Sequence, residues 1–124
     1  MYHRKPLPED VAQAANVRPT KADLGDPATL PAAVTGADVI VHFAGRLFAP
    51  RPERFLLETN TFWFSNLLTA ALHAQVGRVI LISFPHVEGP TSVEQPATGR
   101  LDRQPISVHA RTRLEEERML LGSA

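Results

Sequence analysis

The sequence predicts an α/β fold built around a parallel sheet, and three observations support this class. Residues 39–43 (Val-Ile-Val-His-Phe) and residues 78–83 (Arg-Val-Ile-Leu-Ile-Ser) are short apolar runs rich in β-branched side chains. Runs of this kind are typical of strands that are buried on both faces, as in parallel sheets. The segment between them, over residues 53–75, has helical periodicity and is long enough to connect two parallel strands by a right-handed crossover.

Size and composition limit the classes of protein that remain. The chain has 124 residues, which predicts one domain over residues 1–124. Its 13 Lys and Arg residues balance its 13 Asp and Glu residues, so we expect no nucleic-acid partner and no basic membrane-binding surface. No apolar stretch approaches the ~20 residues needed to span a bilayer. The absence of a signal-peptide pattern and of cysteine predicts a cytoplasmic protein without disulfides or thiolate metal sites.

The first third of the chain predicts short elements. Residues 1–16 are polar and contain two prolines, so we expect a flexible segment in which a short helix starts near Pro8. Residues 16–22 are weakly extended, and Pro19 suits only an edge position. Asp26 followed by Pro27 is a favourable helix start, which predicts a short helix over 27–34.

The rest of the chain predicts two longer helices separated by an irregular segment. In the helix over 53–75, apolar residues recur every three or four positions, and Gly77 is expected to end the helix. Residues 85–105 contain four prolines and two glycines, which predicts a long loop. A final helix is predicted over about 107–121, closed by Gly122.

Several short motifs occur in an order that resembles a known family. They are Asp23-Leu24 followed by Asp26, residues 38–45 (Asp-Val-Ile-Val-His-Phe-Ala-Gly), Asn60, residues 78–83, Val87-Glu88-Gly89, and residues 109–115 (His-Ala-Arg-Thr-Arg-Leu-Glu). Their order and spacing over about residues 17–121 are similar to those of the extended short-chain dehydrogenase/reductase superfamily, in its NAD-dependent epimerase/dehydratase group.

The resemblance implies a fold, a cofactor and a set of binding residues. The fold would be a partial Rossmann-like, doubly wound parallel sheet with helices on both faces. The cofactor would be NAD or NADP, with the Asp23 carboxylate at its adenine. Small residues after the fourth strand would let the backbone approach the ligand. By resemblance, the cofactor-binding residues are Asp23, Leu24, Phe43, Ala44, Gly45 and Asn60.

The sequence departs from the family pattern at the positions that carry catalysis. His109 stands where the family has its tyrosine, and Arg113 stands where it has its lysine. Counting back from Gly89 places the family's catalytic serine or threonine at Phe84, next to Ser83. His109 and Arg113 lie four residues apart on one helical face, where a guanidinium would favour a neutral, basic imidazole. Ser83, His109 and Arg113 are therefore the catalytic candidates.

Two hypotheses for function follow from this pattern. The Gly-rich turn that seats the pyrophosphate does not occur in the sequence, so the first βαβ unit is expected to be missing. One hypothesis is a truncated or divergent NAD(P)-binding domain whose ancestral activity is oxidoreduction or epimerisation of a small molecule, a nucleotide sugar or similar secondary alcohol. The alternative is a non-catalytic binding or interaction module. An apolar edge on the fourth strand would favour a homodimer.

Overall fold

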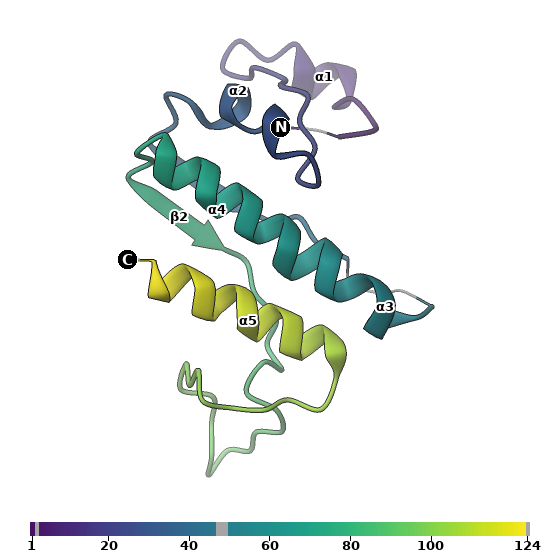
Figure 1. The fold of residues 1–124 in the computed structure, drawn as a ribbon, viewed down its shortest axis with the longest axis vertical. Helices are drawn as coiled ribbons and strands as arrows, with labels where there is room; N and C mark the ends of the chain where they lie inside the picture. The colour runs from purple at the N-terminus through teal and green to yellow at the C-terminus, as the bar shows by residue number, and fades with distance from the viewer. Residues whose placement is uncertain (2, 47–49, 124) are drawn as a thin grey trace.

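The sheet of the computed structural model consists of two parallel strands, and the structure describes residue 1, residues 3–46 and residues 50–123. Strand β1 (Val39–His42) pairs with β2 (Arg78–Leu81), in a register that places Ile40 opposite Val79 and His42 opposite Leu81. The long helical segment between the strands makes the crossover, and α4 runs alongside the sheet (Figure 1). The predicted α/β class with a parallel sheet is confirmed.

The elements before β1 are short because proline interrupts them. Helix α1 spans Glu9–Ala12, and the segment predicted as one helix over 27–34 is a 3-10 turn, η1 (Pro27–Thr29), followed by α2 (Pro31–Val34). Pro31 has no N–H to continue the first turn, so a second helical turn begins there. Asp26 caps η1 as expected, since its carboxylate accepts a hydrogen bond from the Ala28 N–H at 3.1 Å. Residues 16–22 form no strand, apart from an isolated bridge at Lys21.

The long helix contains a π-helical segment that periodicity did not predict. It divides into α3 (Pro52–Leu56), the π segment η2 (Leu57–Phe62) and α4 (Trp63–His73). The hydroxyls of Thr59 and Thr61 donate to the carbonyls four residues earlier, and side-chain bonds of this kind accompany distorted helical turns. The chain leaves α4 at Gln75, which has a φ of 55°, rather than at Gly77. The Val76 N–H then bonds the Ala71 carbonyl at 3.0 Å, as in a Schellman motif.

The last helix, α5 (Val108–Gly122), begins where the sequence predicts. The Ser107 hydroxyl accepts from the Ala110 N–H at 3.1 Å and so caps the first turn. Between β2 and α5 the chain has no helix or strand, and this segment extends away from the helices (Figure 1). The Arg118 guanidinium holds it against α5 by donating to the Leu101 carbonyl at 2.6 Å and the Arg103 carbonyl at 3.1 Å.

The hydrophobic core lies on one face of the sheet only, which corrects one prediction. Val34, Ile40, Leu67 and Ala71 form the core cluster between α2, β1 and α4. On the other face, side chains of both strands are 40–50% exposed: Val39, Val41 and Ile80. The expectation that helices bury both faces of these strands is therefore wrong for the described residues, because the helices that pack on the sheet bury its Ile40 face. No described helix is both long and apolar enough to cross a membrane.

Candidate functional site

A hollow at the carboxyl end of β1 brings together two of the predicted binding segments. It has a volume of about 530 Å³, and Asp23 and Leu24 contribute to one wall while Phe43, Ala44 and Gly45 contribute to another. We call it the β1 hollow. Its other lining residues are Met1, His3, Ala22, Ile40, Val41, His42, Arg46, Trp63 and Leu67. Ligands of open α/β folds bind beyond the carboxyl ends of the strands, and the β1 hollow lies at that position.

The Asp23 carboxylate is held in place at this hollow by its own turn. Its Oδ1 accepts a hydrogen bond from the Gly25 N–H at 2.8 Å, while its backbone N–H and carbonyl both bond the Thr29 hydroxyl. Its Oδ2 lies 2.9 Å from Nε2 of His3, and both side chains are about two-fifths exposed. The following residue, Leu24, accepts at its carbonyl from the Asn66 side chain on α4 at 2.8 Å. The turn is thus anchored to the long helix, with one carboxylate oxygen directed at His3.

Position 45 needs a glycine because the Arg113 side chain lies close to its Cα. A Cβ on Gly45 would lie 2.1 Å from Nη2 of Arg113, and the φ of Gly45 is 148°, a value that L side chains rarely adopt. The guanidinium donates to the Ala44 carbonyl at 3.4 Å and to Oε2 of Glu116 at 2.7 Å. Arg113 is 3% exposed and Glu116 is fully buried. Burial raises the pKa of the Glu116 carboxyl, and the neighbouring Arg113 opposes this rise.

Asn60 lies outside the β1 hollow, but its side chain bonds both the backbone of Arg46, at the edge of the hollow, and Thr112 of α5. Its Oδ1 accepts from the Arg46 N–H at 3.0 Å, and its Nδ2 donates to the Thr112 hydroxyl of α5 at 3.1 Å and to the Arg46 carbonyl at 3.4 Å. The side chain is 1% exposed, so these bonds satisfy a buried amide. Asn60 therefore joins the π segment η2 to α5 and to the chain that follows β1. Its predicted part in cofactor binding stays a prediction.

The three catalytic candidates are each engaged in separate contacts. The Ser83 hydroxyl donates to the Glu117 carboxylate of α5. The His109 ring packs edge-on against Phe84, with the ring centroids 4.3 Å apart, and its buried Nε2 has no hydrogen-bond partner within the described part of the chain. Burial, and secondarily Arg113, lower the pKa of His109. Among the described residues no hydrogen bond joins Ser83, His109 and Arg113 to one another.

Two residues at these contacts were not predicted from the sequence. Glu116 belongs to an acidic run, residues 115–117, that reads as a solvated helix face, and only its spacing of three from Arg113 signals the buried pair. His3 lies twenty residues before Asp23, and no local pattern connects the two. Glu115 and Arg118, which are also three residues apart, pair at 3.3 Å on the surface.

His42, at the end of β1, gives the protein a predicted sensitivity to acid. Burial, and secondarily Arg113, lower its pKa from 6.5 to about 4, and its ring lies 5.0 Å from that of Phe64. Because the pKa of His42 is lower in the folded chain than in the unfolded one, its full contribution to stability is present above pH 6.5. This contribution is lost as the pH falls from 6.5 through 4. At about 1.4 kcal/mol per pKa unit, we expect a loss of about 3 kcal/mol in the free energy of unfolding.

Chemical denaturation at a series of pH values measures this loss. His42→Phe should remove most of it, whereas His73→Phe, at the exposed end of α4, should leave it unchanged. Equal acid sensitivity in wild type and His42→Phe would show that other groups cause the loss.

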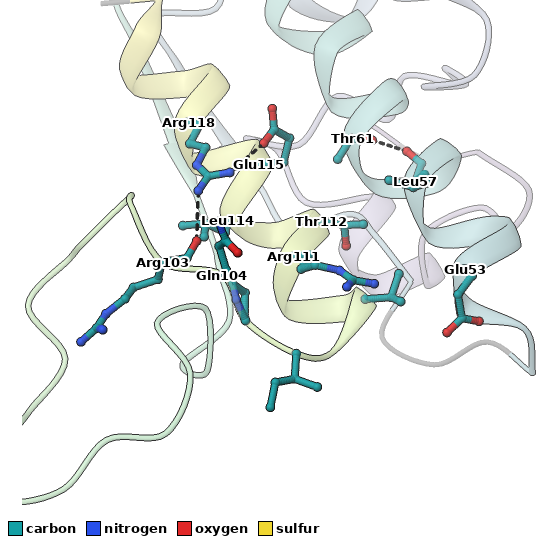
Figure 2. Close-up of a pocket in the computed structure, with 13 residues that line it drawn as sticks. Glu53, Leu57, Thr61, Arg103, Gln104, Arg111, Thr112, Leu114, Glu115 and Arg118 are labelled. Carbon is teal, nitrogen blue, oxygen red and sulfur yellow. Dashed lines mark hydrogen bonds and ion pairs between the residues drawn. The ribbon is translucent and has the colours of Figure 1, made fainter.

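A second cavity, of about 730 Å³, lies between α3, the π segment η2, the chain before α5, and α5 itself (Figure 2). Glu53 and Arg111 project from its two helical walls, and Arg118 closes one end through its bonds to Glu115 and to the Arg103 carbonyl. None of the predicted site residues lines this cavity. Thr112 lines this cavity, and Asn60, which bonds the Thr112 hydroxyl, also bonds Arg46 at the edge of the β1 hollow.

The parallel strands, the crossover helix and the β1 hollow together define an α/β protein of the dinucleotide-binding class. The model of the NAD(P)H-binding family matches residues 2–120. The chain therefore belongs to the NAD(P)H-binding family, and the resemblance to the short-chain dehydrogenase/reductase superfamily is confirmed. None of the curated proteins matches the sequence.

Solved structures that include a dehydratase and a dehydrogenase share the fold. DesIV from Streptomyces venezuelae, a dTDP-glucose 4,6-dehydratase with NAD and TYD bound, is 29% identical, with a TM-score of 0.68 over 77% of this chain and 30% of that chain. RMD from Pseudomonas aeruginosa, complexed with NADPH, is 25% identical, with a TM-score of 0.68 over 90% and 42%. Uronate dehydrogenase from Agrobacterium tumefaciens, at 24% identity, has a TM-score of 0.68 over 81% and 37%. The chain thus spans less than half the length of each.

Proposed function

We propose that this chain binds the adenosine half of NAD or NADP in the β1 hollow. The observation that carries the proposal is that Asp23-Leu24 and Phe43-Ala44-Gly45, which are far apart in the sequence, line the same hollow. A volume of about 530 Å³ lies within the range of about 300–1,000 Å³ that is typical of small-molecule sites.

The residues present fit an adenosine better than a whole dinucleotide. The Asp23 carboxylate is an acceptor for an exocyclic amino group, and Leu24, Phe43 and Trp63 offer apolar surface to a base. For the pyrophosphate, the basic side chains that line the hollow among the described residues are Arg46 and His3, and the sequence has no Gly-rich turn. When bound in a complete site, a nicotinamide dinucleotide supplies hydride transfer.

We further propose that the described chain binds this ligand without catalysing a reaction by itself. General acid–base catalysis needs a group within hydrogen-bond reach of the reacting proton. Ser83 donates to Glu117, the buried Nε2 of His109 has no hydrogen-bond partner among the residues that the structure describes, and Arg113 is paired with Glu116. These contacts support a binding module rather than an enzyme.

A second candidate function is oxidoreduction or epimerisation of a small molecule such as a nucleotide sugar. The observation that favours it is the 29% identity to DesIV, which is a dTDP-glucose 4,6-dehydratase. It would require His109 to act as a base near neutral pH, for which its lowered pKa is suitable. Incubation with nucleotide sugars and NAD or NADP, followed by chromatography of the products as well as by absorbance of the cofactor, separates this candidate from binding alone, because an epimerisation or dehydration returns the hydride and leaves no net NADH.

Calorimetric titration tests the proposed binding function directly. We expect ADP-ribose to bind the full chain with an affinity close to that of NAD, and nicotinamide mononucleotide to bind much more weakly. Asp23→Asn should weaken ADP-ribose binding about tenfold or more, because a hydrogen bond to a charged group contributes about 1.5–3 kcal/mol. The amide oxygen of the substituted side chain can still accept from the Gly25 N–H, so the turn should persist.

The matched control is Asp102→Asn, which changes an exposed carboxylate outside the β1 hollow. It should leave the affinity for ADP-ribose unchanged. Equal affinities of ADP-ribose for wild type and Asp23→Asn, or no binding by wild type at millimolar ligand, would contradict the proposed function.

A further inference from the structure

The cavity of about 730 Å³ between α3 and α5 has no part in the proposed function, and we call it the α3–α5 cavity. Helix α3 and the π segment η2 form one wall, α5 forms a second, and residues 103–106 form a third (Figure 2). Because all three walls belong to this chain, the cavity is a concave site rather than an uncovered face. Its volume lies within the range of about 300–1,000 Å³ that is typical of small-molecule sites.

Two side chains of opposite charge face this cavity without an ion-pair partner. Glu53 projects from α3 and Arg111 projects from α5 (Figure 2). Among the described residues neither side chain takes part in an ion pair, with the other or with a third group. By contrast, Arg118 is bonded to Glu115 and to loop carbonyls, and the Arg103 guanidinium points away from both helical walls (Figure 2). Glu53 and Arg111 are therefore the charges that a ligand would meet.

The start of α5 favours an anion beside Arg111. Val108 is the first residue of this 15-residue helix and lines the cavity, and Arg111 lies about one turn later. The N-terminal end of a helix carries a partial positive charge, and a guanidinium binds a carboxylate through two parallel hydrogen bonds. Across the cavity, the Glu53 carboxylate accepts hydrogen bonds, which suits a ligand ammonium group.

The α3–α5 cavity also offers apolar surface. Leu114 is buried at the α5 wall, whereas Leu57 and Ile106 line the cavity with 59% and 89% of their surface exposed. Large apolar side chains that are exposed beside a cavity gain from contact with the apolar part of a ligand, because this contact removes their surface from water.

We propose that the α3–α5 cavity binds a free α-amino acid with a large apolar side chain. The carboxylate pairs with Arg111 at the start of α5, the ammonium group pairs with Glu53, and the apolar side chain packs on Leu57 and Ile106. A simple anion would leave Glu53 unpaired and a simple cation would leave Arg111 unpaired, so a zwitterion is the class of ligand that satisfies both. Because both charges are exposed, the dissociation constant is on the order of a millimolar. The proposal does not depend on ligand binding in the β1 hollow.

Titration of the full chain with L-phenylalanine, followed by two-dimensional NMR of the backbone amides, tests the proposal. We expect chemical-shift changes at the start of α5 and along α3 and η2, and none at the end of β1. N-Acetyl-L-phenylalanine lacks the ammonium group and L-phenylalaninamide lacks the carboxylate. Each should bind about fivefold more weakly than the amino acid, which is the upper end of what an exposed ion pair contributes.

Two charge-removing variants assign the ends of the ligand. Arg111→Gln should weaken binding of L-phenylalanine about fivefold and leave that of L-phenylalaninamide unchanged, whereas Glu53→Gln should leave that of N-acetyl-L-phenylalanine unchanged. The matched controls are Arg54→Gln and Glu58→Gln, which change exposed neighbours that do not line the cavity and should alter no affinity.

Three results would overturn the proposal. They are the absence of shift changes with L-phenylalanine at tens of millimolar, equal binding of the amino acid and its two derivatives, and unchanged binding of all three ligands by Arg111→Gln and Glu53→Gln. Binding of N-acetyl-L-phenylalanine as tight as that of the amino acid would identify a site for simple anions instead. Titration of the same protein with ADP-ribose keeps the two proposals apart, because its failure with intact amino-acid binding would contradict only the proposed function.

Discussion

Replacing Arg113 with alanine should lower the free energy of unfolding by about 3–5 kcal/mol, because it leaves a fully buried carboxylate without its partner. The Arg113 guanidinium is 2.7 Å from Oε2 of Glu116, and the two side chains are 4% and 0% exposed. Over residues 3–46 and 50–123, Oε1 of the same carboxylate has no hydrogen-bond partner. Urea denaturation at neutral pH, compared with wild type, measures the change.

The double variant Arg113→Met/Glu116→Leu tests whether the stability lost in Arg113→Ala comes from leaving the buried Glu116 carboxylate unpaired. Removing both charges while keeping apolar volume should recover most of the stability lost in Arg113→Ala, since replacing a buried ion pair by apolar residues is often close to neutral. Arg100→Ala, which removes the partner of an exposed aspartate, should have no measurable effect. A loss in Arg113→Ala no larger than that in Arg100→Ala would show that Glu116 is not buried in solution.

The strands and the class of fold could be predicted because they depend on local composition. Consecutive β-branched residues at 39–41, and the apolar run at 79–82 with three β-branched residues, favour strands, and both strands formed. Coverage of the sheet could not be predicted in the same way. The apolar pattern indicates which faces are suited to burial, whereas the elements that pack on the sheet decide which face is buried, and here they left Val41 and Ile80 half exposed.

The candidate site was predictable in its segments but not in its contacts. Asp23 and Gly45 were identified from a resemblance in motif order, and strand direction brings their segments to the same hollow. The partners of Arg113 were not predictable, because an i,i+3 spacing does not say which side of a helix is buried. His109 was predicted as a base from its position, but its environment is set by Phe84, which lies in a long irregular segment without a periodic signal.

Gly45→Ala is expected to have the second large effect on stability, about 3 kcal/mol or more. A backbone conformation with a φ of 148° costs about 1–3 kcal/mol for a residue with a side chain. The added Cβ would also lie 2.1 Å from Nη2 of Arg113. The guanidinium would have to move away from the Ala44 carbonyl and from Glu116, which disturbs the buried pair. Thermal and urea denaturation measure the loss.

A double-mutant cycle with Arg113→Ala identifies the cause of this effect. If the clash dominates, Gly45→Ala should cost clearly less in the Arg113→Ala background than in wild type, with an interaction energy of about 1 kcal/mol or more. If backbone strain dominates, the two costs should be equal. Gly99→Ala, at a φ of 79° in an open loop where a Cβ meets nothing within 4 Å, is the matched control for strain without a clash. A Gly45→Ala protein that is no less stable than Gly99→Ala would contradict the close approach of Arg113, and with it the role of this glycine in leaving room at the end of β1.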